Sequence, residues 1–135
     1  MSDWTNDQAF YRVSLKALIR DNENRILMVS EKNGDLSLPG GGFDHDETIH
    51  ESLQRELLEE IGLTSNFREK LIATEKRHLP HKDAWLLWMV YEIRYDELDF
   101  SIGVDGDSTQ WVEESSLNET TPANKMIRSV LRSIQ

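Results

Sequence analysis

Hydrophobic and polar residues alternate along residues 11–20, with apolar side chains at the odd positions. This two-residue repeat is typical of a strand with one buried face. The other, polar face is expected to carry Arg12, Ser14 and Lys16. A second apolar run at 25–30 follows a turn-forming cluster at 21–24. The two runs together predict a β-hairpin.

A four-residue apolar repeat after Thr48 predicts a helix over residues 48–61. Thr48 and Glu51 have the spacing of a capping box, and Gly62 stands where helices often end in a left-handed residue. We expect Leu58 to widen the buried stripe of this helix. The stripe itself consists of Ile49, Leu53, Leu57 and Ile61.

The remaining elements are mostly strands. Three segments have the composition of strands: 67–78, 84–95 and 110–112. Residues 84–95 are apolar enough for the centre of a sheet. A last helix begins at Thr121–Pro122, with proline in the tolerated first turn. Its expected buried residues are Met126, Ile127, Val130, Leu131 and Ile134. Because strands outnumber helices, we expect an α/β layered domain with a mixed sheet.

Length and composition favour a single globular domain over residues 1–135. No apolar run approaches the roughly 18 residues that span a bilayer, so no membrane partner is expected. The chain has no cysteine, which excludes disulfides, a thiolate nucleophile and cysteine zinc sites. The N-terminal residues lack the basic and apolar regions of a signal peptide, so a cytoplasmic location is expected.

The formal net charge is −10, from 25 acidic and 15 basic residues. Nucleic-acid backbones are bound mainly through Lys and Arg, so this excess argues against nucleic acid as the main partner. It also opposes any phosphate-bearing substrate unless a cation intervenes. The acidity is concentrated, because residues 41–63 hold seven acidic groups and one arginine, and residues 92–114 hold eight and one.

Three glutamates lie beside the apolar stripe of the predicted helix. Residues three and four apart are neighbours on a helix, so Glu56 is adjacent to Glu59 and Glu60. Like charges at this spacing repel, and the helix dipole disfavours anions near the C-terminal end. A divalent cation such as Mg²⁺ resolves the conflict because it prefers oxygen ligands. From these residues alone, a solvated acidic helix face is the alternative.

A longer pattern includes these glutamates: Gly41-x5-Glu47-x7-Arg55-Glu56-Leu57-x-Glu59-Glu60-x-Gly62-Leu63. This spacing matches the Nudix box at every specified position, so the chain resembles a Nudix hydrolase. The resemblance implies an α/β/α sandwich with a mixed β-sheet and a loop-helix-loop motif. It also implies Mg²⁺- or Mn²⁺-dependent cleavage of the pyrophosphate linkage of a nucleoside triphosphate, a nucleotide sugar or an ADP-ribose type of substrate.

The resemblance assigns metal-binding roles to the matching residues. Glu56 and Glu60 are implied to be the principal ligands of the metal. Glu59 is a further ligand, direct or through water. The backbone carbonyl of Gly40, immediately before the motif, is the remaining ligand that the resemblance implies.

Catalytic roles are implied in the same way. Arg55 would orient and neutralise the glutamates, and Glu47 would fix the preceding loop. Family members take their general base from the motif or from a later loop. Glu59 is the candidate within the motif. Asp105 and Asp107 are the later candidates for base or metal ligand, with ordinary turn residues as the alternative.

Candidate substrate contacts lie outside the motif. Four basic residues are candidates to contact phosphates, with plain surface as the alternative for each: Arg12, Lys32, Arg77 and Lys82. Four aromatic residues are candidates to stack on a base, with core or strand-face positions as the alternative: Trp4, Phe10, Tyr11 and Trp85. His78 and His81 have the spacing of a metal pair, but exposed imidazoles in a loop are the favoured interpretation.

Two other kinds of function stay open at this point. A non-catalytic Nudix-like module would bind a nucleotide metabolite as a sensor or regulator, and a structural acidic domain would need no ligand. The presence of all three glutamates of the motif favours the enzyme. We expect a small-molecule nucleotide substrate and a monomer or homodimer.

Overall fold

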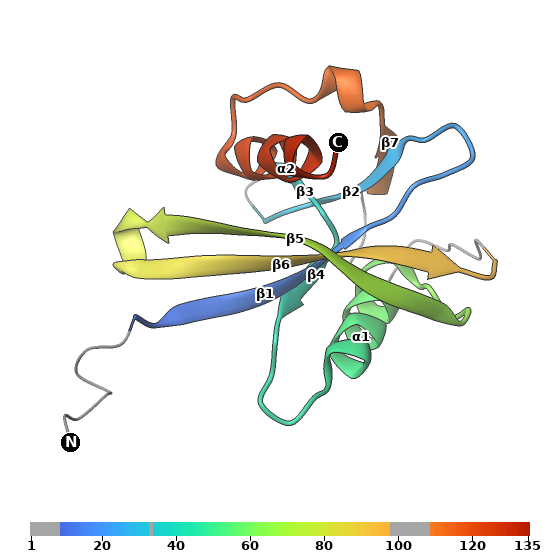
Figure 1. The fold of residues 1–135 in the computed structure, drawn as a ribbon, viewed down its shortest axis with the longest axis horizontal. Helices are drawn as coiled ribbons and strands as arrows, with labels where there is room; N and C mark the ends of the chain where they lie inside the picture. The colour runs from blue at the N-terminus through green and yellow to red at the C-terminus, as the bar shows by residue number, and fades with distance from the viewer. Residues whose placement is uncertain (1–8, 33, 98–108) are drawn as a thin grey trace.

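Two helices lie on opposite sides of a β-sheet in the computed structural model, which describes residues 9–32, 34–97 and 109–135 (Figure 1). The strands are β1 (Tyr11–Leu18), β2 (Ile26–Ser30), β3 (Leu36–Ser37), β4 (Gly40–Gly42), β5 (Phe67–Leu79), β6 (Ala84–Tyr95) and β7 (Thr109–Val112). The helices are α1 (Ile49–Ile61) and α2 (Pro122–Ser133), with short 3-10 helices η2 (Pro80–Lys82) and η3 (Glu114–Ser116).

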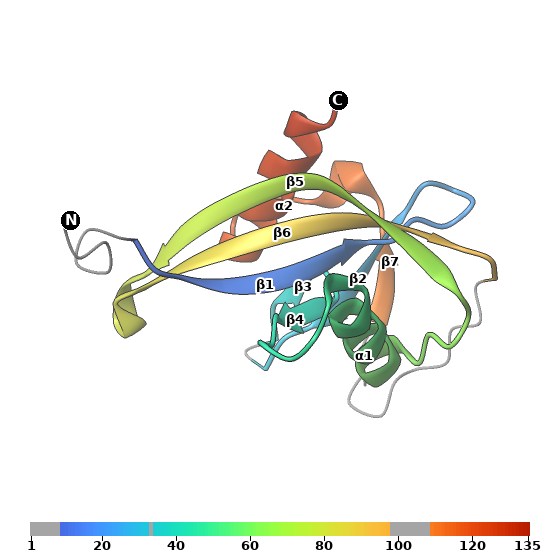
Figure 2. The same cartoon turned by 60° about the horizontal axis from the view of Figure 1, so that its bottom comes forward.

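The larger sheet has the strand order β4-β1-β6-β5. β1 and β6 run parallel, whereas β4 pairs with β1, and β5 with β6, in antiparallel fashion. The predicted mixed sheet is therefore confirmed, and residues 84–95 form one of its inner strands as expected. The β5–β6 hairpin carries η2 at its tip and extends past both helices (Figure 2).

The predicted hairpin of residues 11–20 and 25–30 is correct only in its turn. The Asp21 carboxylate accepts hydrogen bonds from the backbone N–H of Arg25 at 2.8 Å and from its Nε at 2.7 Å. Beyond an isolated bridge the strands separate, because β2 pairs with β3 and β7 in a second, three-stranded sheet. Along its two edges β1 pairs instead with β4 and β6, which come from distant segments of the chain.

Helix α1 begins and ends as its sequence predicts. The Thr48 hydroxyl accepts a hydrogen bond from the Glu51 N–H, and the Glu51 carboxylate accepts one from the Thr48 N–H. Gly62 adopts a left-handed φ of 70° and donates its N–H to carbonyls of the last turn. Leu53 and Leu57 are fully buried in a cluster that also includes residues of β1 and β6. This packing fixes the rotation of α1, and with it the direction of the glutamates.

Helix α2 covers the other face of the larger sheet. Four of its predicted core residues are buried in a second cluster with Trp88 and Val90 of β6: Met126, Ile127, Val130 and Leu131. Thr121 caps the helix by accepting a hydrogen bond from the Asn124 N–H. None of the helices in the described ranges combines the length and hydropathy needed to cross a membrane.

Four predicted side-chain positions are wrong, and one of them is Ser14, which was expected on a polar face but is only 8% exposed. Leu58 is 50% exposed, because the core side of α1 is filled by the main stripe alone. Ile134 is 39% exposed, because it follows the last residue of α2 at Ser133. Lys16, expected on a polar face, is only 7% exposed, because the cluster beneath α2 covers that face of β1 as well.

Candidate active site

The glycines of β4 allow α1 to approach the sheet closely. A Cβ atom on Gly41 would lie 2.5 Å from Oε1 of Glu56, so any side chain there would displace that carboxylate. A Cβ atom on Gly40 would lie 2.0 Å from the Leu15 carbonyl oxygen. Gly40 also has a φ of 134°, which other residues rarely adopt. The Gly40 N–H donates a hydrogen bond of 3.0 Å to Oε1 of Glu60.

Glu56 and Glu60 are the two carboxylates that this arrangement brings together. Burial, together with the hydrogen bond and charge of Glu56, raises the pKa of Glu60 to about 7. The Gly40 N–H and the nearby charge of Lys16 act in the opposite direction. The side chain of Glu56 is only 15% exposed. Two carboxylates held close together away from bulk water favour either a shared proton or a bound cation.

Arg55 connects this pair to the loop that precedes α1. Its Nε donates a hydrogen bond of 2.8 Å to one carboxylate oxygen of Glu47, and its Nη2 donates another of 2.8 Å to the other oxygen. Its Nη1 donates a third, also 2.8 Å, to Oε1 of Glu56. The hydrogen bonds from Arg55 hold the pKa of Glu47 below its ordinary value. A fork-to-fork pair of this kind fixes both side chains in position.

Glu59 lies apart from the other two glutamates. Its side chain is 53% exposed and approaches Arg55 Nη1 only to 3.8 Å. Among the described residues, no three Asp, Glu, His or Cys side chains are placed to enclose a metal ion. The Glu56–Glu60 pair nevertheless fits Mg²⁺ or Mn²⁺, because such ions take one or two carboxylates and complete their shell with water and substrate phosphates.

Lys16 is the nearest buried cation, and sequence reasoning missed it. Its Nζ donates to the Leu38 carbonyl at 3.2 Å and lies 5.2 Å from the centre of the Trp88 ring. Burial lowers the pKa of Lys16, while the charges of Glu31, Glu60 and Glu56 oppose that effect. The available signal was a lysine within the apolar run of residues 13–19.

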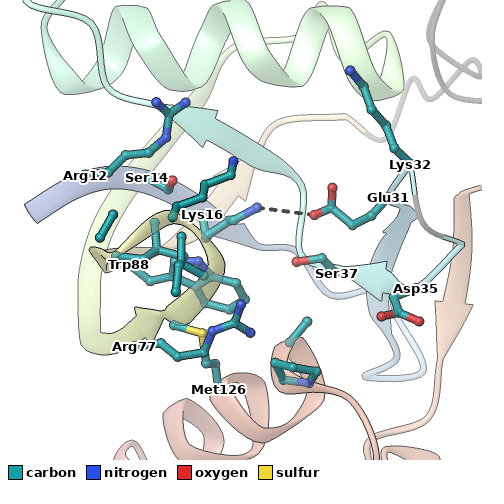
Figure 3. Close-up of a pocket in the computed structure, with 16 residues that line it drawn as sticks. Arg12, Ser14, Lys16, Glu31, Lys32, Asp35, Ser37, Arg77, Trp88 and Met126 are labelled. Carbon is teal, nitrogen blue, oxygen red and sulfur yellow. Dashed lines mark ion pairs between the residues drawn. The ribbon is translucent and has the colours of Figure 1, made fainter.

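A pocket of about 580 Å³ lies on the α2 side of the larger sheet, beside Lys16 (Figure 3). The structure brings all four basic candidates to its lining: Arg12, Lys32, Arg77 and Lys82. Trp88 and Met126 supply apolar surface between them. The sequence did not single out Trp88 as a candidate for the site, yet Trp88 lines the pocket.

The aromatic candidates lie elsewhere. Tyr11 and Trp85 alternate with Arg12 and Leu86, which line the pocket, and so occupy the opposite face of the sheet. Their rings are 6.4 Å apart and both are exposed. Phe10 is 72% exposed. Tyr11 and Trp85 therefore do not line the pocket, because they occupy the other face of the sheet, and Phe10 does not line it either.

The two histidines do not form a metal pair. His78 packs on Trp85 with ring centres 5.0 Å apart, and its Nε2 lies 3.5 Å from Asp83. His81 is exposed in η2. Exposed imidazoles in a loop near Pro80 were the favoured interpretation; both side chains are exposed, but His78 belongs to β5 and not to a loop. Three further candidates lie outside the described residues: Trp4, Asp105 and Asp107.

Comparison with known proteins gives one family. A sequence model described as the NUDIX domain matches residues 10–133. Nudix hydrolase 13, mitochondrial, from Arabidopsis thaliana is 42% identical over 50 residues, which are 36% of this chain and 25% of that protein. The chain thus spans only about a quarter of the length of this plant relative.

Two longer similarities cover most of the chain. The RNA pyrophosphohydrolase of Legionella pneumophila (strain Corby) is 29% identical over 126 residues, covering 79% of this chain and 72% of that protein. The crystal structure of a MutT protein from Methanosarcina mazei Go1 superposes with a TM-score of 0.74 at 24% identity, covering 93% of this chain and 96% of that one. This structural likeness supports the fold.

Proposed function

The chain belongs to the NUDIX family, whose domain model spans residues 10–133, and on this premise we propose that it is a Mg²⁺- or Mn²⁺-dependent pyrophosphohydrolase. The proposed substrate is a nucleoside diphosphate joined to another group, such as a nucleoside triphosphate, a nucleotide sugar or ADP-ribose. The observation that carries the proposal is the Glu56–Glu60 pair, held against Gly41 and the Gly40 N–H. A merely solvated acidic helix face would not require this close approach.

Glu56 and Glu60 would hold the metal, with Glu59 and the carbonyl of Gly40 as further ligands. When bound, the metal would neutralise phosphate charge and activate the attacking water as a Lewis acid. Arg55 would keep Glu56 in place through its 2.8 Å hydrogen bond. The same arginine ties the preceding loop to α1, so its role is positional.

The chain's own groups would handle the proton and the phosphates. Glu59 is the proposed general base, because its exposed carboxylate is open to water beside the buried pair. Lys16 would contact the phosphates from the pocket side. Arg12 would do so as well, since its Nη2 lies 3.2 Å from the position of a Cβ on Gly42. Asp105 and Asp107, which lie outside the described residues, stay the predicted alternatives for the base.

Small nucleotides are favoured over RNA as substrates, although one relative is an RNA pyrophosphohydrolase. The net charge of −10 opposes a long nucleic-acid backbone. A non-catalytic nucleotide-binding module is the second candidate, and it would bind the same ligands without turnover. The cytoplasmic location, the single domain over 1–135 and the monomeric or dimeric state stay predictions.

Phosphate release from a nucleotide panel tests the proposal. Each nucleotide is incubated with the protein in Mg²⁺, in Mn²⁺ and in EDTA, and we expect cleavage only with metal. Glu56→Gln should lower kcat by orders of magnitude while the circular dichroism spectrum stays unchanged. Glu97→Gln, at an exposed position outside the site, is the matched control and should retain full activity.

Two outcomes contradict the proposal in different ways. If no nucleotide is cleaved but several bind, the non-catalytic module is correct. If Glu56→Gln keeps nearly full activity, the assignment of the metal ligands is wrong.

A further inference from the structure

The pocket gathers positive charge in a chain whose net charge is −10. Its lining holds five basic side chains and two acidic ones, Glu31 and Asp35. The basic residues are Arg12, Lys16, Lys32, Arg77 and Lys82. Within the described ranges, only Lys16 of these five forms an ion pair at 4.0 Å or less. The pocket therefore suits a ligand with several negative charges.

The register of the sheet divides these cations into two groups. Arg12 pairs with Leu86 on β6, and Leu86 pairs with Arg77 on β5, so all three lie at one level. With adjacent strands about 4.8 Å apart, the Cα atoms of Arg12 and Arg77 are roughly 10 Å apart. Lys82 follows in η2, at the end of β5. Arg77 and Lys82 thus form a group at the β5 edge of the pocket.

This distal group lies far from the carboxylate pair. Gly40, which contacts Glu60, pairs with Lys16, four residues along β1 from Arg12. Four residues of strand and three strand spacings place the Cα atoms of Gly40 and Arg77 roughly 15–20 Å apart. Among the cations of the pocket, Lys16 and Arg12 lie nearest the carboxylates. Arg77 and Lys82 therefore face a different part of any substrate whose pyrophosphate lies at Glu56 and Glu60.

The surface between the two groups is apolar. Leu86 separates Arg12 from Arg77 at the same level of the sheet, and Trp88 is the next pocket-facing residue of β6. Met126 of α2 lies beside Arg77 in the pocket (Figure 3). An apolar floor with cations at both ends fits a ligand that has an uncharged part between two anionic groups.

We propose that Arg77 and Lys82 bind a second phosphate group of the substrate, separate from the pyrophosphate that is cleaved. The substrate class is then a nucleotide that carries an additional phosphate on its nucleoside, or a second nucleotide beyond the scissile linkage. The inference rests on the proposed function for the position of the pyrophosphate. The presence of Arg77 and Lys82 in the pocket does not depend on that function.

Binding of two small probes tests this without turnover. Adenosine 3′,5′-bisphosphate and AMP differ by one phosphate, and their dissociation constants are measured by isothermal titration calorimetry in EDTA. We expect the bisphosphate to bind about tenfold more tightly, which corresponds to about 1.4 kcal/mol. Arg77→Gln and Lys82→Gln should each reduce this preference. Arg68→Gln, on the same strand but outside the pocket, is the matched control and should keep it.

Steady-state kinetics then test whether Arg77 and Lys82 contribute to the cleavage of substrates that carry the extra phosphate. Coenzyme A and its 3′-dephospho form both contain a pyrophosphate, as do dinucleoside tetraphosphates, and kcat/KM is compared within this set in Mg²⁺. The proposal expects higher kcat/KM for the substrates with the extra phosphate or second nucleotide, and a loss of that advantage in Lys82→Gln. Lys82 is exposed, so this variant should fold normally.

The results separate the two proposals. The distal phosphate site is overturned, even if nucleotides are cleaved, by either of two results. One is equal affinity for the bisphosphate and AMP; the other is a loss of the bisphosphate preference in Arg68→Gln as large as that in Arg77→Gln. Absence of all cleavage, together with a preference for the bisphosphate that depends on Arg77, overturns the proposed hydrolysis and leaves the distal site standing.

Discussion

Replacing Glu60 by glutamine should stabilise the metal-free protein at neutral and alkaline pH. The pKa of Glu60 is about 7, against an ordinary value of 4.5, chiefly because the carboxyl is partly buried. The folded protein therefore holds this proton more tightly than the unfolded chain does. Stability is lost as the pH rises from about 4.5 to about 7, and above that range the full cost of the charge remains.

The size of the effect follows from the two pKa values. At about 1.4 kcal/mol per tenfold change in proton affinity, ionising Glu60 costs at most about 3.5 kcal/mol of folding free energy. Partial exposure and relaxation reduce this, so we expect Glu60→Gln to gain about 2 kcal/mol at pH 8. Glutamine also keeps an acceptor for the Gly40 N–H. In a domain of this size the gain corresponds to roughly 5–10 °C in Tm.

Urea denaturation in EDTA at several pH values between 4.5 and 8 measures the difference between the two proteins. That difference isolates Glu60 from the other titrating groups, and it should grow with pH. Glu59→Gln, at a side chain that is 53% exposed, is the control and should change stability by less than about 0.5 kcal/mol. Adding Mg²⁺ should stabilise the wild type more than Glu60→Gln. If the variant is destabilised in EDTA at pH 8, the carboxylate pair is not the strained feature described above.

Two further predictions concern the groups around this pair. Gly41→Ala places a Cβ 2.5 Å from Oε1 of Glu56, so metal-dependent phosphate release should fall at least about tenfold while circular dichroism shows a folded protein; undiminished activity would contradict the need for glycine there. Arg55→Lys keeps the charge but loses the bidentate hydrogen bond to Glu47. We expect kcat to fall, and the free energy of unfolding to fall by about 1–3 kcal/mol, with a lower Tm. If Arg55→Lys has the kcat and the unfolding free energy of the wild type, the positive charge alone is enough to hold Glu47 and Glu56 in place.

Local sequence patterns predicted the helices and most of the strands. The capping box of Thr48 and Glu51 and the left-handed Gly62 depend on residues at most a few positions apart, so they are visible in the sequence and are confirmed. The helix period also places Arg55 beside Glu59, four residues on, at 3.8 Å, whereas the hydrogen bond from Arg55 to Glu56 was implied only by the resemblance. Patterns of this kind also identified the motif and the family.

Pairing between distant segments was decided only by the tertiary structure. Residues 11–20 and 25–30 look like a hairpin, but β1 lies between β4 and β6, where its two faces pack into two different clusters. The burial of Lys16 has the same cause. No local pattern records which strand lies beside another across 70 residues of chain.

The site, too, has features that the sequence determined and features that only the tertiary structure decided. The sequence by itself determined that Glu56, Glu59 and Glu60 share one helix and that Gly41 precedes them at a fixed spacing. The tertiary structure decided that only Glu56 and Glu60 are buried together, because the packing of α1 against β4 turns Glu59 to solvent. It also placed the cations of β1, β5 and η2 around one pocket, since strand order and register set which side chains share a face.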